Sequence, residues 1–194
     1  MITITAKEIE KEKESFEVCE LAQSIFYILY DSKTQETISK EQFLETLPIP
    51  LQVAELLNDF LGPDSLTEAI EHVTIDQRDP GRALYYQDKL LWALEEIGRN
   101  DVAILVQGAI RQYEEYKKLD EETESALRRI DPHDDNAICD SLAIYIKKHA
   151  EEIVTKEYIE KSERALKGGA SDTKKYEDRL KMSIRGLSRS TISD

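Results

Sequence analysis

The sequence predicts an all-α protein, a compact bundle of about seven helices that contains a central antiparallel helical hairpin. Three observations predict this fold. Apolar residues recur every three or four positions over long stretches, which is the spacing of one helix face. Only seven Gly and five Pro interrupt the 194 residues. Serine capping boxes and a Gly stop signal mark the expected helix ends.

Three helices are expected before residue 62. The first covers residues 5–30 and closes at a turn that begins with Asp31. Ser39 and Gln42 have the spacing of a capping box, so a short helix follows and ends near Leu47, because Pro48 disfavours a helical residue before it. Pro50 then fits the first turn of a third helix, which stops at Gly62 and Pro63.

The middle of the chain carries the strongest helical pattern. A second capping box at Ser65 and Glu68 opens a short helix, and a turn at 79–81 separates it from two longer helices. The helix over 83–97 is expected to bury Leu84, Leu90, Leu91, Leu94 and Ile97. Gly98 suits its end, and the next helix starts at Asn100 or Asp101 and runs to about Tyr113. Because the connection is short, the two form an antiparallel hairpin.

Two further helices and a change of composition complete the chain. Acidic residues open a helix over 119–130, and the last long helix starts near Ile138 and continues to about Leu166. Residues 167–194 carry seven basic and four acidic side chains and follow a Gly-Gly joint. The sequence therefore predicts an acidic helical domain over 1–166 and a basic, flexible C-terminal tail over 167–194.

The charge balance excludes several functions. The chain has 40 acidic and 26 basic residues and a net charge of -14. Direct nucleic-acid binding and an anionic membrane surface both require an excess of Lys and Arg, so neither is expected. The N-terminal stretch lacks an apolar signal region, and Cys19 and Cys139 are expected to be reduced core residues. We therefore expect a cytoplasmic protein.

No catalytic motif is present, and neither a cofactor nor a metal is expected. Glycine-rich phosphate loops, nucleophile elbows and zinc-binding HExxH patterns are all missing from the sequence. A divalent metal could use the acids near His133, namely Asp131, Asp134, Asp135 and Asp140. The EF-hand pattern fails there, because its sixth position is Asn136 and its twelfth is Leu142. A helix–helix turn is the favoured interpretation, and a metal-dependent enzyme is the weakest alternative.

The acid surplus is the main functional signal. It either keeps the protein soluble or imitates a phosphate backbone, since carboxylates four residues apart on a helix lie about 6 Å apart along its axis. A basic DNA-binding protein would then meet a surface of similar potential. The candidate partner-binding residues are Glu95, Glu96, Asp101, Glu114, Glu115, Glu121, Glu122 and Glu124.

Residues 83–113, ALYYQDKLLWALEEIGRNDVAILVQGAIRQY, carry a family resemblance. The segment resembles the central helical hairpin of a bacterial family that includes a double-stranded-DNA mimic protein. The matching positions are Ala93, Leu94, Ile97, Gly98, Ala103 and Ala109. The stretch over 47–53 also looks like the entry helix of that family, and the resemblance covers roughly residues 24–150. It implies an all-α, often dimeric protein that binds a DNA-binding regulator through an acidic face and has no catalytic activity.

We therefore expect a non-enzymatic, bacterial or phage interaction protein that occupies the nucleic-acid-binding surface of a basic protein partner. The alternative is an immunity-like or antitoxin-like inhibitor of a cationic toxin. A homodimer is compatible with both hypotheses.

Overall fold

The computed structural model describes residues 6–62, 66–74, 80–130, 137–153 and 160–161, and the regular structure of these residues is entirely helical. The predicted all-α fold is therefore confirmed. The helices are α1 (Ala6–Leu29), α2 (Ser32–Gln35), α3 (Lys40–Leu44), α4 (Ile49–Leu61), α5 (Leu66–Thr74), α6 (Pro80–Glu96), α7 (Asn100–Tyr116), α8 (Glu121–Ile130), α9 (Ala137–Lys148) and α10 (Ala150–Ile153).

The described residues form ten helices where the sequence predicted about seven, and the helices that it did not predict are the single turns α2 and α10. α2 replaces a predicted turn, since the Asp31 carboxylate accepts bonds from the backbone N–H and the hydroxyl of Thr34 at 2.9 and 2.8 Å. The predicted capping box at the start of α3 is confirmed, with Ser39 and Gln42 bonded reciprocally. α10 is separate because the helix expected to run to about Leu166 is interrupted after Lys148.

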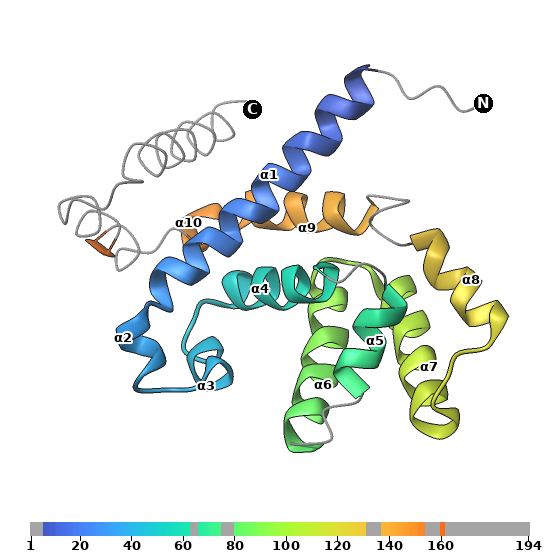
Figure 1. Cartoon of the computed structure of the whole chain (residues 1–194). Coiled ribbons are helices and arrows are strands. Elements are labelled where there is room, and N and C mark those ends of the chain that lie inside the picture. The colour runs from blue at the N-terminus through green and yellow to red at the C-terminus, as the bar shows by residue number, and fades with distance from the viewer. Residues whose placement is uncertain (1–5, 63–65, 75–79, 131–136, 154–159, 162–194) are drawn as a thin grey trace.

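α4 lies at the centre of the arrangement. α1 and α9 cross each other on one side of α4, and α5, α6 and α7 pack side by side on the other side (Figure 1). α8 lies at the edge, against α7 and α5. This arrangement leaves one face of α7 and most of α8 at the surface.

The predicted hairpin is confirmed in α6 and α7. Gly98 adopts a positive φ of 78°, and the N–H of Arg99 bonds to the carbonyl of Leu94 at 2.8 Å. This is the pattern of a glycine-terminated helix, which lets the chain reverse within three residues. α7 consequently starts at Asn100, beside the last residues of α6.

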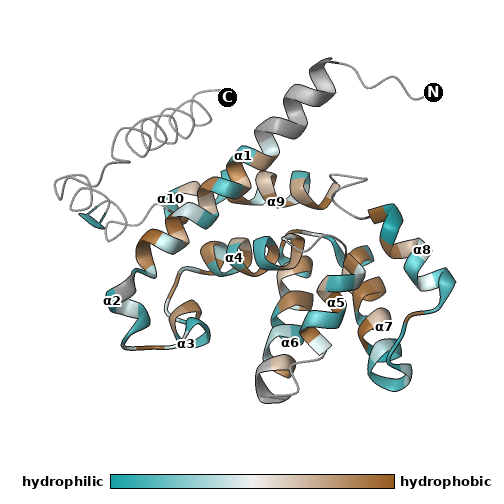
Figure 2. Cartoon of the chain, in the orientation of Figure 1, coloured by the Kyte–Doolittle hydropathy of each residue, from teal (hydrophilic) through white to brown (hydrophobic). Residues whose placement is uncertain are grey.

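One core runs through the whole bundle (Figure 2). Phe26 of α1, Leu57 of α4, Leu94 of α6 and Leu142 of α9 have no exposed surface. The prediction that Leu84 is buried is wrong, because 58% of its surface is exposed. Gln87 occupies the buried stripe instead and bonds to the carbonyl of Val73 at 3.2 Å.

The end of the described chain returns to the end of α1. The Lys161 ammonium donates to the carbonyl of Leu29 at 2.7 Å and lies 3.4 Å from the Asp31 carboxylate. A cation suits the C-terminal end of a helix, where carbonyl groups lack partners. The predicted tail over 167–194 lies outside the described residues. None of the described helices is long and apolar enough to cross a membrane.

Candidate acidic interaction surface

The eight predicted carboxylates lie in two groups at opposite ends of α7. The hairpin group consists of Glu95 and Glu96, the last residues of α6, and Asp101 in the first turn of α7. The α8 group consists of Glu114, Glu115, Glu121, Glu122 and Glu124, which lie at the end of α7 and the start of α8. Asp101 and Glu114 are thirteen residues apart, so about 20 Å of helix separates the groups.

The hairpin group contains two carboxylates that are not engaged by another described residue. Glu95 and Glu96 are exposed, and neither carboxylate makes a hydrogen bond or ion pair with another described residue. Asp101 is already engaged, because Arg99 donates two bonds of 3.0 Å to its two oxygens. These bonds hold the pKa of Asp101 below its usual value.

The α8 group is divided in the same way. Glu114 accepts a bond of 3.1 Å from Gln87, Glu115 accepts a bond from the Tyr116 hydroxyl, and half-buried Glu124 lies 3.9 Å from Arg128. Glu121 and Glu122 are exposed in the first turn of α8, and their carboxylates make no such contact within the part of the chain that the structure describes. The site therefore reduces to four free carboxylates: Glu95, Glu96, Glu121 and Glu122.

The density of acid around these residues is lower than the sequence analysis assumed. Residues 95–130 contain nine carboxylates and six Lys or Arg, a net charge of -3 in 36 residues. Residues 1–62 contain twelve carboxylates and five Lys, a net charge of -7. Lys117, Lys118, Arg128 and Arg129 all flank the α8 group. The availability of the four free carboxylates, rather than their local excess, therefore distinguishes this surface.

The alternative metal site receives no support among the described residues, which hold no group of three side chains suited to a metal. Asp131, His133, Asp134 and Asp135 lie outside those residues. Asp140 is described, and its carboxylate accepts a bond of 2.6 Å from the Ser15 hydroxyl, which joins α9 to α1.

A buried cluster of charges was missed by the sequence analysis. The Lys40 ammonium, in the first turn of α3, lies 2.8 Å from a Glu55 oxygen and 2.5 Å from an Asp59 oxygen, both on α4. It also lies 5.3 Å from the centre of the Phe26 ring. Glu55 has no exposed surface. One cation thus forms ion pairs with two carboxylates at the junction of α1, α3 and α4.

The electrostatics of this cluster follow from burial and from its surplus negative charge. Burial, partly offset by Lys40, raises the pKa of Glu55 to about 7. The two carboxylates raise the pKa of Lys40 even though its own burial opposes this. Neither Glu55 oxygen makes a hydrogen bond of good geometry to a described residue, so the carboxylate is poorly solvated. A sequence signal existed, because Glu55 interrupts an apolar run in α4.

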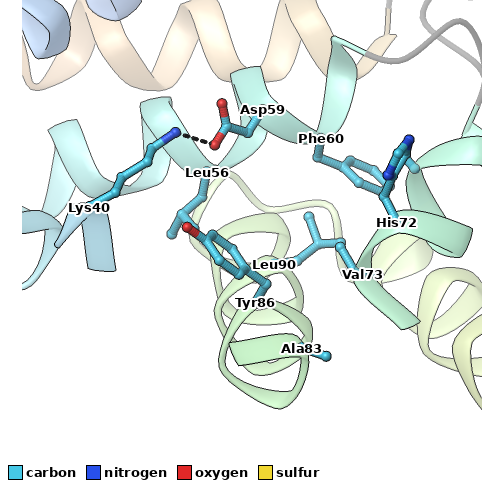
Figure 3. Close-up of a pocket in the computed structure, with 10 residues that line it drawn as sticks. Lys40, Leu56, Asp59, Phe60, His72, Val73, Ala83, Tyr86 and Leu90 are labelled. Atoms are coloured by element: carbon cyan, nitrogen blue, oxygen red, sulfur yellow. Dashed lines mark hydrogen bonds and ion pairs between the residues drawn. The ribbon is translucent and has the colours of Figure 1, made fainter. Parts of the chain in front are cut away.

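A cavity of about 450 Å³ extends from this cluster between α4, α5 and α6 (Figure 3). Lys40 and Asp59 lie at one side, and His72 lies at the other side with Phe60 and Val73. The walls are largely apolar. The Tyr86 hydroxyl donates to Glu41 at 3.0 Å, and the ammonium of Lys40 is already bound by two carboxylates.

The two cysteines are free, as predicted. Cys19 is buried and its thiol lies 3.8 Å from the carbonyl oxygen of Cys139, across the contact between α1 and α9. Burial is the main reason that the pKa of Cys19 is raised to about 12, which keeps the thiol protonated and unreactive.

Comparison with known proteins gives no match to a family model, a curated protein or a solved structure. The resemblance to the DNA-mimic family therefore stays a prediction. The functional argument depends on the geometry of the four free carboxylates.

Proposed function

We propose that this protein is a non-enzymatic, acidic interaction protein that binds the nucleic-acid-binding surface of a basic protein partner. The observation that carries the proposal is that Glu95, Glu96, Glu121 and Glu122 are exposed and that their carboxylates make no hydrogen bond or ion pair with any described residue. Such side chains retain their charge for a partner and need to break no internal contact on binding.

The position of the hairpin group strengthens the argument. Glu95 and Glu96 end α6, and no basic residue lies in its last turn. Negative charge at the C-terminal end of a helix opposes the helix dipole, at a cost of about 0.3–1 kcal/mol per charge. Because Glu95 and Glu96 slightly destabilise the fold at this position, their presence supports a role in binding rather than in folding.

The separation of the two groups indicates the kind of partner surface. Glu96 and Glu121 lie at opposite ends of α7, about 20 Å apart along its axis. A partner that contacts both must be cationic over that length. DNA-binding surfaces meet this requirement, because they follow several successive phosphates. The net charge of -14 adds long-range attraction and therefore faster encounter.

The test uses affinity capture from the host lysate, identification of the retained protein by mass spectrometry, and competition by duplex DNA with the purified pair. We expect a cationic partner that duplex DNA releases. A cationic partner that DNA does not release would indicate the toxin inhibitor instead. Retention of neutral or acidic proteins alone would contradict both hypotheses.

Two matched variants locate the surface. Glu121→Lys/Glu122→Lys and Glu20→Lys/Glu36→Lys both move the net charge from -14 to -10, and all four positions are exposed. The first variant should lose at least tenfold in affinity for the partner, whereas the control, on α1 and after α2, should change little. Equal losses would show that only the overall charge matters.

A further inference from the structure

The outer face of α7 is exposed and carries an ordered set of side chains. Asp101, Ile104, Gly108 and Arg111 follow one another at intervals of three or four residues, so they form one stripe. Ile104 is 72% exposed, the largest fraction for any large apolar side chain in the described residues. The guanidinium of Arg111 makes no hydrogen bond or ion pair with a described residue.

Neither the packing nor the backbone conformation of the described residues requires a glycine at position 108. It lies in the middle of α7, and a Cβ atom placed there would meet nothing within 4 Å. Its φ does not lie in the left-handed range. A glycine at such a position destabilises a helix by about 1 kcal/mol relative to alanine. A close approach by another molecule would account for it, since a glycine lets two helices come near each other.

The stripe is complementary to itself. Asp101 and Arg111 lie equally far from position 106, one on each side, and so do Ile104 and Gly108. When two α7 helices pair in opposite directions around that point, each residue faces its counterpart on the other copy. Asp101 then meets Arg111 of the second copy, and Ile104 meets Gly108 of the second copy. A two-fold axis repeats both contacts, as an isologous interface requires.

We propose that the protein forms a homodimer through antiparallel packing of α7 against α7 of a second copy. The exposed Ile104 fills the space left above Gly108, and the ion pairs between Asp101 and Arg111 fix the register. Asp101 is 67% exposed beside Arg99, so its carboxylate remains accessible to a second cation. A single pair of 17-residue helices falls short of a standard interface of about 1,200–2,000 Å². The dimer should therefore be weak and concentration-dependent, with a Kd of about 1–100 μM.

The dimer has a consequence for the acidic groups. Because the two α7 helices run in opposite directions, the hairpin group of one copy comes to the same end as the α8 group of the other. The four free carboxylates are thereby gathered at two ends of the dimer. The self-association itself is argued from α7 alone and does not require the proposed function.

Charge exchange tests the register directly. Sedimentation velocity is measured between about 1 and 500 μM for the parent, for Asp101→Arg and for Arg111→Asp. Each single variant faces like charges in its own dimer, so its self-association should weaken at least tenfold. An equimolar mixture of the two variants places opposite charges at both contacts, so it should form a heterodimer at the parent's concentration range.

Gly108→Ala provides a second readout that separates folding from association. The added methyl group has open space in the monomer, so the melting temperature should rise, whereas self-association should weaken at least threefold. Ser125→Ala is the control, because Ser125 is exposed on α8, outside the stripe, and alanine favours a helix there too.

A parent that stays monomeric at 500 μM, or a mixture of the charge variants that does not associate, would overturn the homodimer. Neither result would affect the proposed function, which is tested separately by the loss of partner binding in Glu121→Lys/Glu122→Lys.

Discussion

Two regions of the molecule differ in whether their charged side chains are buried and paired or exposed and unpaired. At the junction of α3 and α4, Lys40, Glu55 and Asp59 lie together, and Glu55 is completely buried. At the ends of α7, Glu95, Glu96, Glu121 and Glu122 are exposed, and their carboxylates bond to no other described residue. Buried charges are costly to leave without a partner, and exposed charges contribute little to folding. The first region should therefore determine stability, and the second should determine binding.

The largest expected effect comes from removing the buried cation. Lys40→Met leaves Glu55 without its counter-charge and should reduce the free energy of unfolding by about 3 kcal/mol, at the lower end of the range for breaking a buried pair, because Glu55 can take up a proton. Chemical denaturation at pH 7 measures this loss.

Lys89→Met is the matched control. The side chain of Lys89 is 26% exposed, close to the 22% of Lys40, and lies 2.7 Å from a Glu45 oxygen. The carboxylate of Glu45, however, is 49% exposed, whereas that of Glu55 is fully buried. The control should lose at most about 1 kcal/mol, as exposed ion pairs do. Similar losses in the two variants would remove the distinction between the regions.

The pH dependence gives the next largest effect. The pKa of Glu55 is raised to about 7, so the folded protein binds this proton more tightly than the unfolded chain does. Its contribution to stability is therefore present at low pH and is lost as the pH rises through 7. Between pH 5 and 8 this loss should amount to about 2 kcal/mol.

Glu55→Gln should remove that slope. Position 55 is then uncharged at every pH. The difference between parent and variant in the free energy of unfolding, followed against pH, therefore reports the titration of Glu55. A parent and variant with parallel pH profiles would show that Glu55 titrates normally in the folded protein.

The smallest effects concern the exposed carboxylates. Glu121 and Glu122 lie in the first turn of α8, where negative charge is favourable, so reversing both to Lys should cost about 1 kcal/mol. Glu95 and Glu96 lie at the end of α6, so reversing both should stabilise the fold by about 1 kcal/mol. Thermal melts of the two double variants compare these opposite signs.

Local patterns in the sequence were sufficient for much of the fold. The Ser39 capping box, the entry of α4 at Pro50 and the glycine stop at Gly98 were all predicted and are confirmed. Each depends on residues within a few positions of one another. The misplacement of Leu84 has a physical reason, because the buried stripe of α6 passes through polar Gln87, which conceals the apolar period.

The site was harder to predict, because its properties depend on distant residues. Lys40 and Glu55 are 15 positions apart, and their pairing requires α3 to pack against α4. The eight predicted carboxylates were correctly expected at the surface, apart from half-buried Glu124. The sequence could not show that Arg99 and Gln87 engage Asp101 and Glu114. Together with the bond between Tyr116 and Glu115 and the ion pair between Arg128 and Glu124, those contacts reduced the candidate surface to four residues.

The rate of association with the captured partner tests the central claim most directly. Stopped-flow measurements at about 50 mM salt compare the parent, Glu121→Lys/Glu122→Lys and the control Glu20→Lys/Glu36→Lys. Exposed charges act mainly on the encounter, within roughly a Debye length of 10–14 Å at this ionic strength. The account predicts that the α8 variant associates at least tenfold more slowly, with a much smaller change in dissociation, and that the control stays close to the parent. Equal association rates for the α8 variant and the control would contradict it.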